Sequence, residues 1–244
     1  MKRTIKMPSI DQFRNTVNSI IHTARYTGLN DDGVAMYDNN IKLPVIKAIG
    51  TEKIHGTNAS VCYSEPDGFW VQSKKKIITP EKDNASCAFH AEQIKDKWIK
   101  LIKSLANEHN IDLNKNIISL YFEWCGYGIQ TRTAIDGIKE KMAMIFRHFK
   151  VSPLENNDDI PANWYETKVQ DRWIQDTENQ IFNISNFPIY EFEIDFNEPL
   201  MIQNKMIDTV LELEANSPVG QAFGFENNIG EGMVISFIFN NNLH

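Results

Sequence analysis

The pattern of apolar runs limits what this chain can fold into. Short runs typical of β-strands outnumber the helical patterns, and the two kinds do not alternate regularly. A doubly wound parallel sheet would need that alternation, so the pattern predicts an α+β fold with antiparallel sheets. The expected strands cover residues 43–49, 59–63, 69–72, 117–124, 142–149, 187–196 and 231–239.

Helical periodicity marks three other segments. A helix is expected from Ser9, which can cap it, and further helices over 89–106 and 205–214. Residues 28–40 are expected to form a loop, and residues 154–163 are the best candidate for an internal linker. A Pro-Asp-Gly turn at 66–68 should join two of the strands.

Charge is distributed unevenly along the chain. The 244 residues carry 25 basic and 32 acidic side chains, a net charge of −7, yet only Lys168, Arg172 and Lys205 are basic after Lys150. The first 150 residues are therefore net basic and the remainder is strongly acidic. This split excludes a uniformly basic nucleic-acid coat, but it suits a basic first part that faces an anion.

Targeting signals are weak in this sequence. No apolar run approaches the roughly 18 residues of a membrane span, and the basic N-terminus is not followed by the apolar region of a secretory signal. The three cysteines lack CxxC spacing, which argues against a disulfide framework and structural zinc. We therefore expect a cytoplasmic protein without a membrane partner.

The segment Thr51–Asn58 is the most informative for chemistry. Lys53 ends an expected strand, and strand alternation places Lys53 and His55 on one side, just before Gly56. A lysine amine is a nucleophile only when it is unprotonated, which requires partial burial or neighbouring cations. On this octet alone, a catalytic lysine and a surface lysine before a hairpin are equally good interpretations.

Residues 53–58, Lys-Ile-His-Gly-Thr-Asn, resemble motif I of the covalent nucleotidyltransferases, whose general form is Lys-x-Asp-Gly. Histidine in place of aspartate, followed by Thr-Asn, is similar to the bacteriophage RNA ligase 2 branch. Later segments resemble that family's other motifs in the same order: the Ser-Arg element at 73–76, motif III at 122–126, motif IIIa at 145–149 and motif IV at 230–234.

The resemblance implies a fold and a reaction. The expected fold is a single nucleotidyltransferase domain over residues 1–244, with antiparallel sheets flanked by helices and a nucleotide cleft between them. The expected reaction is ATP-dependent RNA ligation: a lysine attacks the α-phosphorus of ATP, the AMP passes to an RNA 5′-phosphate, and a 3′-hydroxyl displaces it. The implied cofactors and partners are ATP, Mg²⁺ or Mn²⁺, and RNA ends or nicks, bound by a monomer that acts in RNA repair, in the host cytoplasm if it is phage-encoded.

The resemblance also assigns roles to residues. Lys53 is the expected nucleophile, and Glu231 the expected ligand of the divalent ion. The expected ATP-binding residues are Glu52 and Ile54 through backbone groups, His55 and Asn58 near the phosphates and metal, Lys74 in place of the family arginine, Glu123 at the ribose and Phe149 under the adenine.

Several of these residues also have a purely structural interpretation. Phe149 lies in an apolar strand and is equally good as a core residue, Glu123 could be a strand-edge carboxylate, and residues 74–76 could form a solvated turn. The alternating acidic residues Glu191, Glu193 and Asp195 share one strand face, and a solvated face is favoured there over a metal site.

One expected motif is missing. Ser236 stands where the family has a lysine after motif IV, and the lysine pair of motif V does not appear, nor does a C-terminal RNA-binding domain. We expect either a fragment of the nucleotidyltransferase domain or a degenerate member that binds nucleotide or RNA without efficient sealing. An ATP-dependent DNA ligase and a GTP-using capping enzyme are the rival enzymes, and His55 with Asn58 counts against both.

Overall fold

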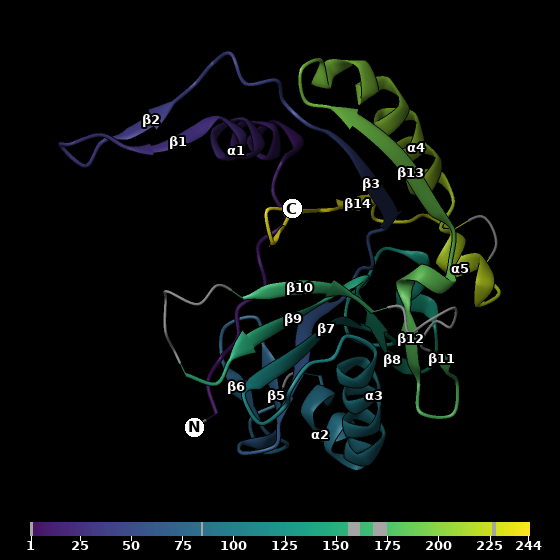
Figure 1. Cartoon of the computed structure of the whole chain (residues 1–244). Helices are drawn as coiled ribbons and strands as arrows, with labels where there is room; N and C mark the ends of the chain where they lie inside the picture. Colours follow the sequence, from purple (N-terminus) through teal and green to yellow (C-terminus); the bar gives the residue numbers. More distant parts are fainter. Residues whose placement is uncertain (1, 84, 156–161, 168–174, 226–227) are drawn as a thin grey trace.

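Two β-sheets, one above the other, organise the molecule (Figure 1). The computed structural model describes residues 2–83, 85–155, 162–167, 175–225 and 228–244. Most strand pairs are antiparallel, β12 with β8 being parallel, and the helices are few. The expected mixed α+β class with antiparallel sheets is therefore confirmed.

The larger sheet has nine strands among the described residues and is built around the long central strand β7. Strands β4, β8 and β9 all pair with β7, and β8 and β9 follow different halves of it. Its strands are β4 (Thr57–Ser64), β5 (Gly68–Ser73), β6 (Ile77–Ile78), β7 (Asn116–Gly126), β8 (Lys141–Ile145), β9 (His148–Pro153), β10 (Asn163–Glu166), β11 (Gln175–Asp176) and β12 (Ile181–Asn183).

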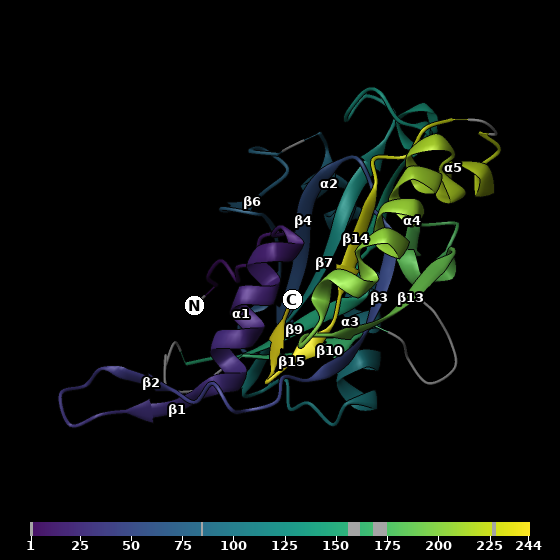
Figure 2. The same ribbon diagram turned by 90° about the horizontal axis from the view of Figure 1, so that it is seen from above.

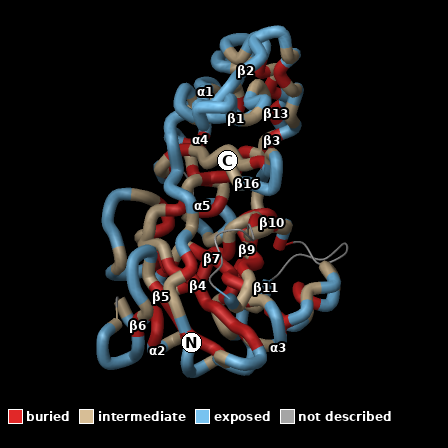
Figure 3. The backbone as a smooth tube through the Cα atoms, turned by 60° about the vertical axis from the view of Figure 1, so that its left-hand side comes forward, coloured by how far each residue is buried: buried red, intermediate tan, exposed pale blue. Residues whose placement is uncertain are grey.

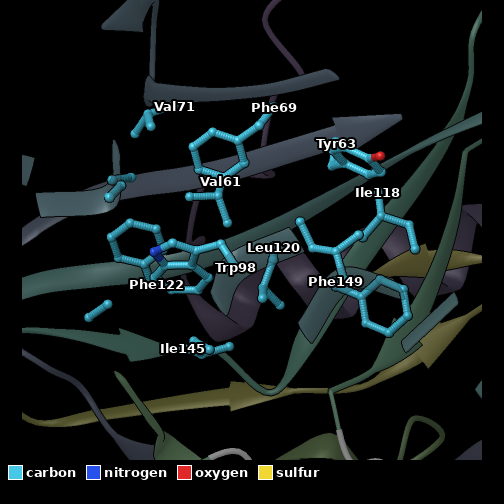
Figure 4. Close-up of a cluster of buried hydrophobic side chains, with 14 of the residues drawn as sticks. Val61, Tyr63, Phe69, Val71, Trp98, Ile118, Leu120, Phe122, Ile145 and Phe149 are labelled. Atoms are coloured by element: carbon cyan, nitrogen blue, oxygen red, sulfur yellow. The ribbon is translucent and has the colours of Figure 1, made fainter. Parts of the chain in front are cut away.

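One face of this sheet is covered by helices α2 (Cys87–Gln93) and α3 (Lys95–Glu108). Trp98 is fully buried and stacks on Phe122 of β7, with ring centroids 5.4 Å apart. The lysines between the apolar positions of α3 stay on its outer side, as the helical period predicts. Figure 3 shows how the buried residues concentrate in the strands, and Figure 4 shows the side chains of this core.

The smaller sheet places β3 (Val45–Glu52) between β13 (Ile189–Asp195) and β14 (Met233–Ser236). Helices α1 (Phe13–Arg25) and α4 (Gln203–Ala215) belong to the same apolar cluster, which includes Ile20, Phe192 and Met206 (Figure 2). The remaining elements are β1 (Tyr26–Leu29), β2 (Ala35–Tyr37), η1 (Ala134–Gly137), η2 (Ile184–Asn186), η3 (Pro199–Ile202), α5 (Pro218–Ala222), β15 (Ile238–Phe239) and β16 (Asn242–Leu243).

Several expected elements differ in detail. The predicted strand over 142–149 is divided into β8 and β9, because the chain between Phe146 and Lys150 has two more residues than the part of β7 opposite it and bulges out of the pairing. The predicted helix over 89–106 is divided at Ile94 into α2 and α3. The predicted 231–239 strand is likewise divided into β14 and β15.

Three other expectations had mixed outcomes. The first helix begins after Gln12 rather than at Ser9, and the expected loop over 28–40 contains most of the β1–β2 hairpin. The turn at 66–68 is confirmed, with Gly68 at φ +68° joining β4 to β5. Most of the expected linker at 154–163 lies outside the described residues.

Candidate functional site

The segment Lys53–Gly56 crosses from one sheet to the other. It follows β3 of the smaller sheet, which ends at Glu52, and precedes β4 of the larger sheet, which begins at Thr57. The Lys53 backbone N–H donates to the carbonyl of Gly232, 2.9 Å away, so the segment is fixed to the chain just before β14. Both sheets therefore supply residues to one site around Lys53.

Lys53 and Glu231 form the centre of this site. Strand β14 pairs with β3 so that Met233 lies opposite Glu52, which brings the preceding Glu231 beside Lys53. The Lys53 ammonium and the Glu231 carboxylate form an ion pair, and their side chains are 39% and 27% exposed. The amine is thus accessible to a ligand and has a carboxylate in contact with it.

Glu123 adds a second carboxylate from the larger sheet. It lies on β7 directly opposite Asn58 of β4. Burial is the largest cause that raises its pKa to about 8, and the nearby charge of Glu231 raises it further, while the charges of Lys53 and Lys74 lower it. Four of the predicted residues, Lys53, Lys74, Glu123 and Glu231, are therefore close enough to interact electrostatically.

Gly56 allows the two strands of the site to approach. A Cβ atom at this position would lie 2.4 Å from the Trp124 carbonyl oxygen and 2.9 Å from Cγ of Glu123. Small movements cannot relieve these clashes, because the first atom belongs to the backbone and the second lies near the base of the Glu123 side chain. Glycine is required here for close packing of β4 against β7, which holds Glu123 next to motif I.

Glu52 is buried and serves as a bridge between elements. Its side chain accepts hydrogen bonds from the Ser217 hydroxyl and from the Val219 N–H, the latter at 2.9 Å, at the start of α5. Burial raises its pKa, and these two hydrogen bonds counteract the effect. Ile54 is also buried, in an apolar cluster with Cys125 and Met142, so only the backbone groups of Glu52 and Ile54 can face a nucleotide.

His55 has a partner that the sequence did not reveal. Its Nδ1 atom lies 2.9 Å from Oδ2 of Asp136, whose side chain is only 7% exposed. The same carboxylate oxygen accepts from the N–H and the hydroxyl of Thr133, at 2.8 and 3.2 Å. The Thr-x-x-Asp spacing at 133–136 signals a capping box, but nothing in the sequence connects it with His55.

Asn58 and Lys74 lie at the edges of the site. The Asn58 amide contacts the sulfur of Met7 at 3.6 Å, so the N-terminal segment reaches motif I. Lys74 is exposed in a tight turn that is closed by a 2.8 Å hydrogen bond from the Ser73 N–H to the Lys76 carbonyl. This turn is compatible both with a solvated turn and with a phosphate contact at residues 74–76. The charge of Lys74 lowers the pKa of Glu123, which favours a role for Lys74 at the site.

Phe149 does not lie at the site. It is fully buried among the core side chains of Figure 4. Its ring stacks on that of Tyr165, with the centroids 5.6 Å apart. A base has no access to a ring that is fully buried, so the expected stacking on adenine is wrong for this residue and the core interpretation holds. Phe146 is half-buried and follows Ile145, and its N–H donates to the Tyr121 carbonyl of β7 at 3.0 Å. The pairing therefore continues to Phe146, and strand alternation places its side chain on the face that carries Tyr121 and Glu123.

A divalent ion would find few protein ligands here. Among the described residues, no three His, Cys, Asp or Glu side chains converge. Glu231 nevertheless fits a hard cation whose shell is completed by phosphate oxygens and water, as Mg²⁺ prefers, because its side chain is partly exposed beside Lys53. Glu191 and Glu193 are exposed on β13, in agreement with a solvated acidic face.

Comparison with known proteins agrees with this arrangement. Residues 46–236 match the family model described as RNA ligase, from β3 to the end of β14. The chain therefore belongs to the RNA ligase family. A search of curated proteins found no match. No helix in the described part of the chain has the length and apolar character needed to cross a membrane.

Proposed function

We propose that this chain is an ATP-dependent RNA ligase, or its adenylyltransferase domain, that works through a lysyl-AMP intermediate on Lys53. The observation that carries the proposal is the convergence of Lys53, Glu231 and Glu123 between two sheets of a chain in the RNA ligase family. The two sheets, with this site between them, then form one nucleotidyltransferase domain.

The first step transfers AMP to the protein. Glu231, in contact with the Lys53 ammonium, is placed to take its proton, which leaves a neutral amine. That amine attacks the α-phosphorus of ATP, a P–N bond forms, and the bond to pyrophosphate breaks. Mg²⁺ or Mn²⁺, held by Glu231 together with phosphate oxygens and water, would neutralise charge on the phosphates.

Other residues would hold the nucleotide. Glu123 is proposed to bind the ribose hydroxyls and Lys74 a phosphate, since the two face the same site. Phe146 replaces Phe149 as the proposed aromatic partner of adenine. His55, fixed by Asp136, and Asn58 are proposed to position the phosphates.

Sealing then takes two further transfers. An RNA 5′-phosphate oxygen attacks the lysyl-AMP phosphorus and releases the neutral lysine, which regains a proton from Glu231 or water. A 3′-hydroxyl then attacks the 5′-phosphate, forms the phosphodiester and expels AMP. Backbone and cationic groups aimed at the transferring phosphate would stabilise its charge in each step.

Covalent labelling tests this proposal. The protein is incubated with α-labelled ATP and Mg²⁺ or Mn²⁺ and then denatured. Wild type and Lys47→Ala, which changes an exposed lysine on the same strand β3, should retain label, and Lys53→Ala should not. Wild-type protein without acid-labile label under either metal would overturn the assignment.

Ser236 motivates a second candidate, a nucleotide- or RNA-binding member that does not catalyse sealing. It lies on β14 opposite Ile49, where the family resemblance leads one to expect a lysine. This candidate predicts ATP binding that survives Lys53→Ala, with no release of pyrophosphate. A sealing assay with ATP that compares nicked RNA with nicked DNA separates an RNA ligase from a DNA ligase.

A further inference from the structure

A cavity lies apart from the Lys53 site. It has a volume of about 430 Å³ and is lined by residues of the N-terminal segment, of strands β9 and β10, and of the β15–β16 hairpin. Its walls include Lys6, Met7, Lys150, Trp164, Asn242 and Leu243. Two of these wall segments, at the two ends of the chain, lie outside residues 46–236, so membership of the family does not assign the cavity.

The cavity opens on the same face of the large sheet as Glu123. Lys150 of β9 pairs with Ser119 of β7, and alternation along β7 puts Ser119 and Glu123 on one face. Tyr121 lies between them, and its ring is 5.8 Å from that of Trp164. Four residues along a strand span about 13 Å, so a ligand at the Lys53 site and one in the cavity would be close neighbours.

The N-terminal segment joins the two places. Its Ile5 carbonyl accepts hydrogen bonds from Tyr121 and Gln72 of the sheet, at 3.0 and 2.6 Å. Met7 then contacts Asn58 of motif I at 3.6 Å, while Lys6 lines the cavity. The same stretch of chain therefore forms a wall of the cavity and an edge of the proposed adenylate site.

The cavity is positively charged. Lys6 is exposed, and the Lys150 ammonium lies 5.6 Å above the Trp164 ring and donates to the Lys6 carbonyl at 3.1 Å. Burial, followed by the charge of nearby Arg3, lowers the pKa of Lys150. Across the described parts of the chain, neither lysine nor Arg3 has an ion pair with a carboxylate, so an anion would relieve the repulsion among them.

Apart from Asn242, the remaining wall is apolar and aromatic, and it includes Met7, Trp164 and Leu243. Cations beside an aromatic and apolar wall are the combination with which proteins hold single-stranded nucleic acid, the phosphate on the cations and the base on the wall. A volume of about 430 Å³ is within the roughly 300–1,000 Å³ of small-ligand sites. One nucleotide fits this chemistry and this size.

We propose that the cavity binds one nucleotide of the RNA strand next to the end that is sealed, with its phosphate at Lys6 and Lys150 and its base against Trp164 and Leu243. The identity of the ligand as RNA rests on the proposed function. The cavity then holds the strand in register so that its end reaches Lys53.

RNA titration in the absence of ATP tests the proposal. A fluorescent, 5′-phosphorylated single-stranded RNA is bound to wild type, Lys6→Gln and Lys100→Gln at several salt concentrations. Among the described residues, Lys6 is bonded through its backbone carbonyl and its side chain is exposed. Lys100 is a matched exposed lysine on α3, which covers the opposite face of the sheet. Lys6→Gln should weaken binding about tenfold, as expected for one charge-assisted contact, and reduce the salt slope by about 0.7.

The Lys100→Gln control distinguishes specific binding of RNA in the cavity from non-specific attraction of RNA to surface lysines. Lys100→Gln should bind RNA as wild type does; equal losses in both variants, or none in Lys6→Gln, would overturn the proposal. In a second readout, RNA with a photoreactive uridine should crosslink to the peptides that hold Lys6, Trp164 or Leu243, and crosslinks confined to other peptides would also overturn it. Labelling of Lys53 by ATP needs no RNA, so it tests the proposed function separately.

Discussion

The Lys53 ammonium lies against the Glu231 carboxylate, although 178 residues separate them in the chain. The pairing of β14 with β3, together with the hydrogen bond from Lys53 N–H to the Gly232 carbonyl, brings them together. The proposed nucleophile is thus held by the edge strand of the smaller sheet. We propose two roles for the Glu231 carboxylate: it accepts the Lys53 proton, and it binds the divalent cation.

Glu231→Gln should slow formation of lysyl-AMP. The amide can still contact Lys53, but it cannot accept the proton or offer a charged oxygen to a cation. We expect a loss of about 100-fold in the rate at saturating ATP, typical of a missing general base. The rate of covalent labelling measures it, with Glu191→Gln, an exposed glutamate on β13, as the matched control. An unchanged rate would show that Glu231 is not part of the chemistry.

The sequence predicted those parts of the fold and site that depend on local pattern. Strand periodicity located the core of β3, β4, β5 and β7, and the motif spacing located Lys53, Glu123 and Glu231, which the structure brings together. Phe149 was misplaced because an apolar strand residue can face either side of a sheet. A bulge between Phe146 and Phe149, which no local pattern indicated, interrupts the alternation before Phe149.

Partners that come from distant segments could not be predicted. Asp136 reaches His55 from 81 residues away, and Ser217 reaches Glu52 from 165 residues away. Ser217-Pro218 is a recognisable helix start, and 133–136 a recognisable capping box. Each pattern describes only its own turn, so tertiary packing alone determines which motif I residue it supports.

Glu123→Gln should change how stability depends on pH. The pKa of Glu123 is about 8 in the folded protein against 4.5 as its ordinary value. Between these values the unfolded chain is ionised while the folded one keeps its proton, so folding stability is lost as pH rises from about 5 to 8. Glutamine cannot ionise, so the variant does not lose this stability. Its free energy of unfolding should rise relative to that of wild type by about 2 kcal/mol over that window, after allowance for solvent screening. Urea unfolding at both ends of the window measures the difference; a difference that stays constant with pH contradicts the assignment.

Asp136→Asn should act through His55. The substitution keeps the shape but removes the charge that His55 and Thr133 share. We expect lysyl-AMP formation to slow about tenfold, the cost of about 1.4 kcal/mol for a weakened charged hydrogen bond. If the effect passes through the imidazole, His55→Ala combined with Asp136→Asn should lose no more than His55→Ala alone. Additive losses in this double-mutant cycle would assign Asp136 a purely structural role.

Ser217→Ala should destabilise the fold by about 2–3 kcal/mol. The hydroxyl donates to the buried carboxylate of Glu52 and also accepts from the Gly220 N–H at 2.8 Å, as the cap of α5. Each loss costs about 1 kcal/mol or more. Chemical denaturation measures the change, and Ser9→Ala, an exposed serine outside any helix, should stay within about 0.5 kcal/mol of wild type. If the two alanine variants are equally stable, the bridge from Glu52 to α5 contributes nothing to stability.

Paired substitutions at Phe149 and Phe146 separate the core from the nucleotide site. Phe149→Ala should cost about 3–5 kcal/mol, because it opens a cavity among fully buried residues. Phe149→Leu, which keeps most of the volume, should fold and bind ATP as wild type does. Phe146→Ala, at a half-buried position, should weaken ATP binding by about 1–3 kcal/mol, the value of one base stacked on an aromatic ring. Chemical denaturation measures the loss of stability, and calorimetric titration with ATP measures the binding. Weaker binding by Phe149→Leu, with Phe146→Ala unaffected, would mean that the adenine contacts Phe149 and not Phe146.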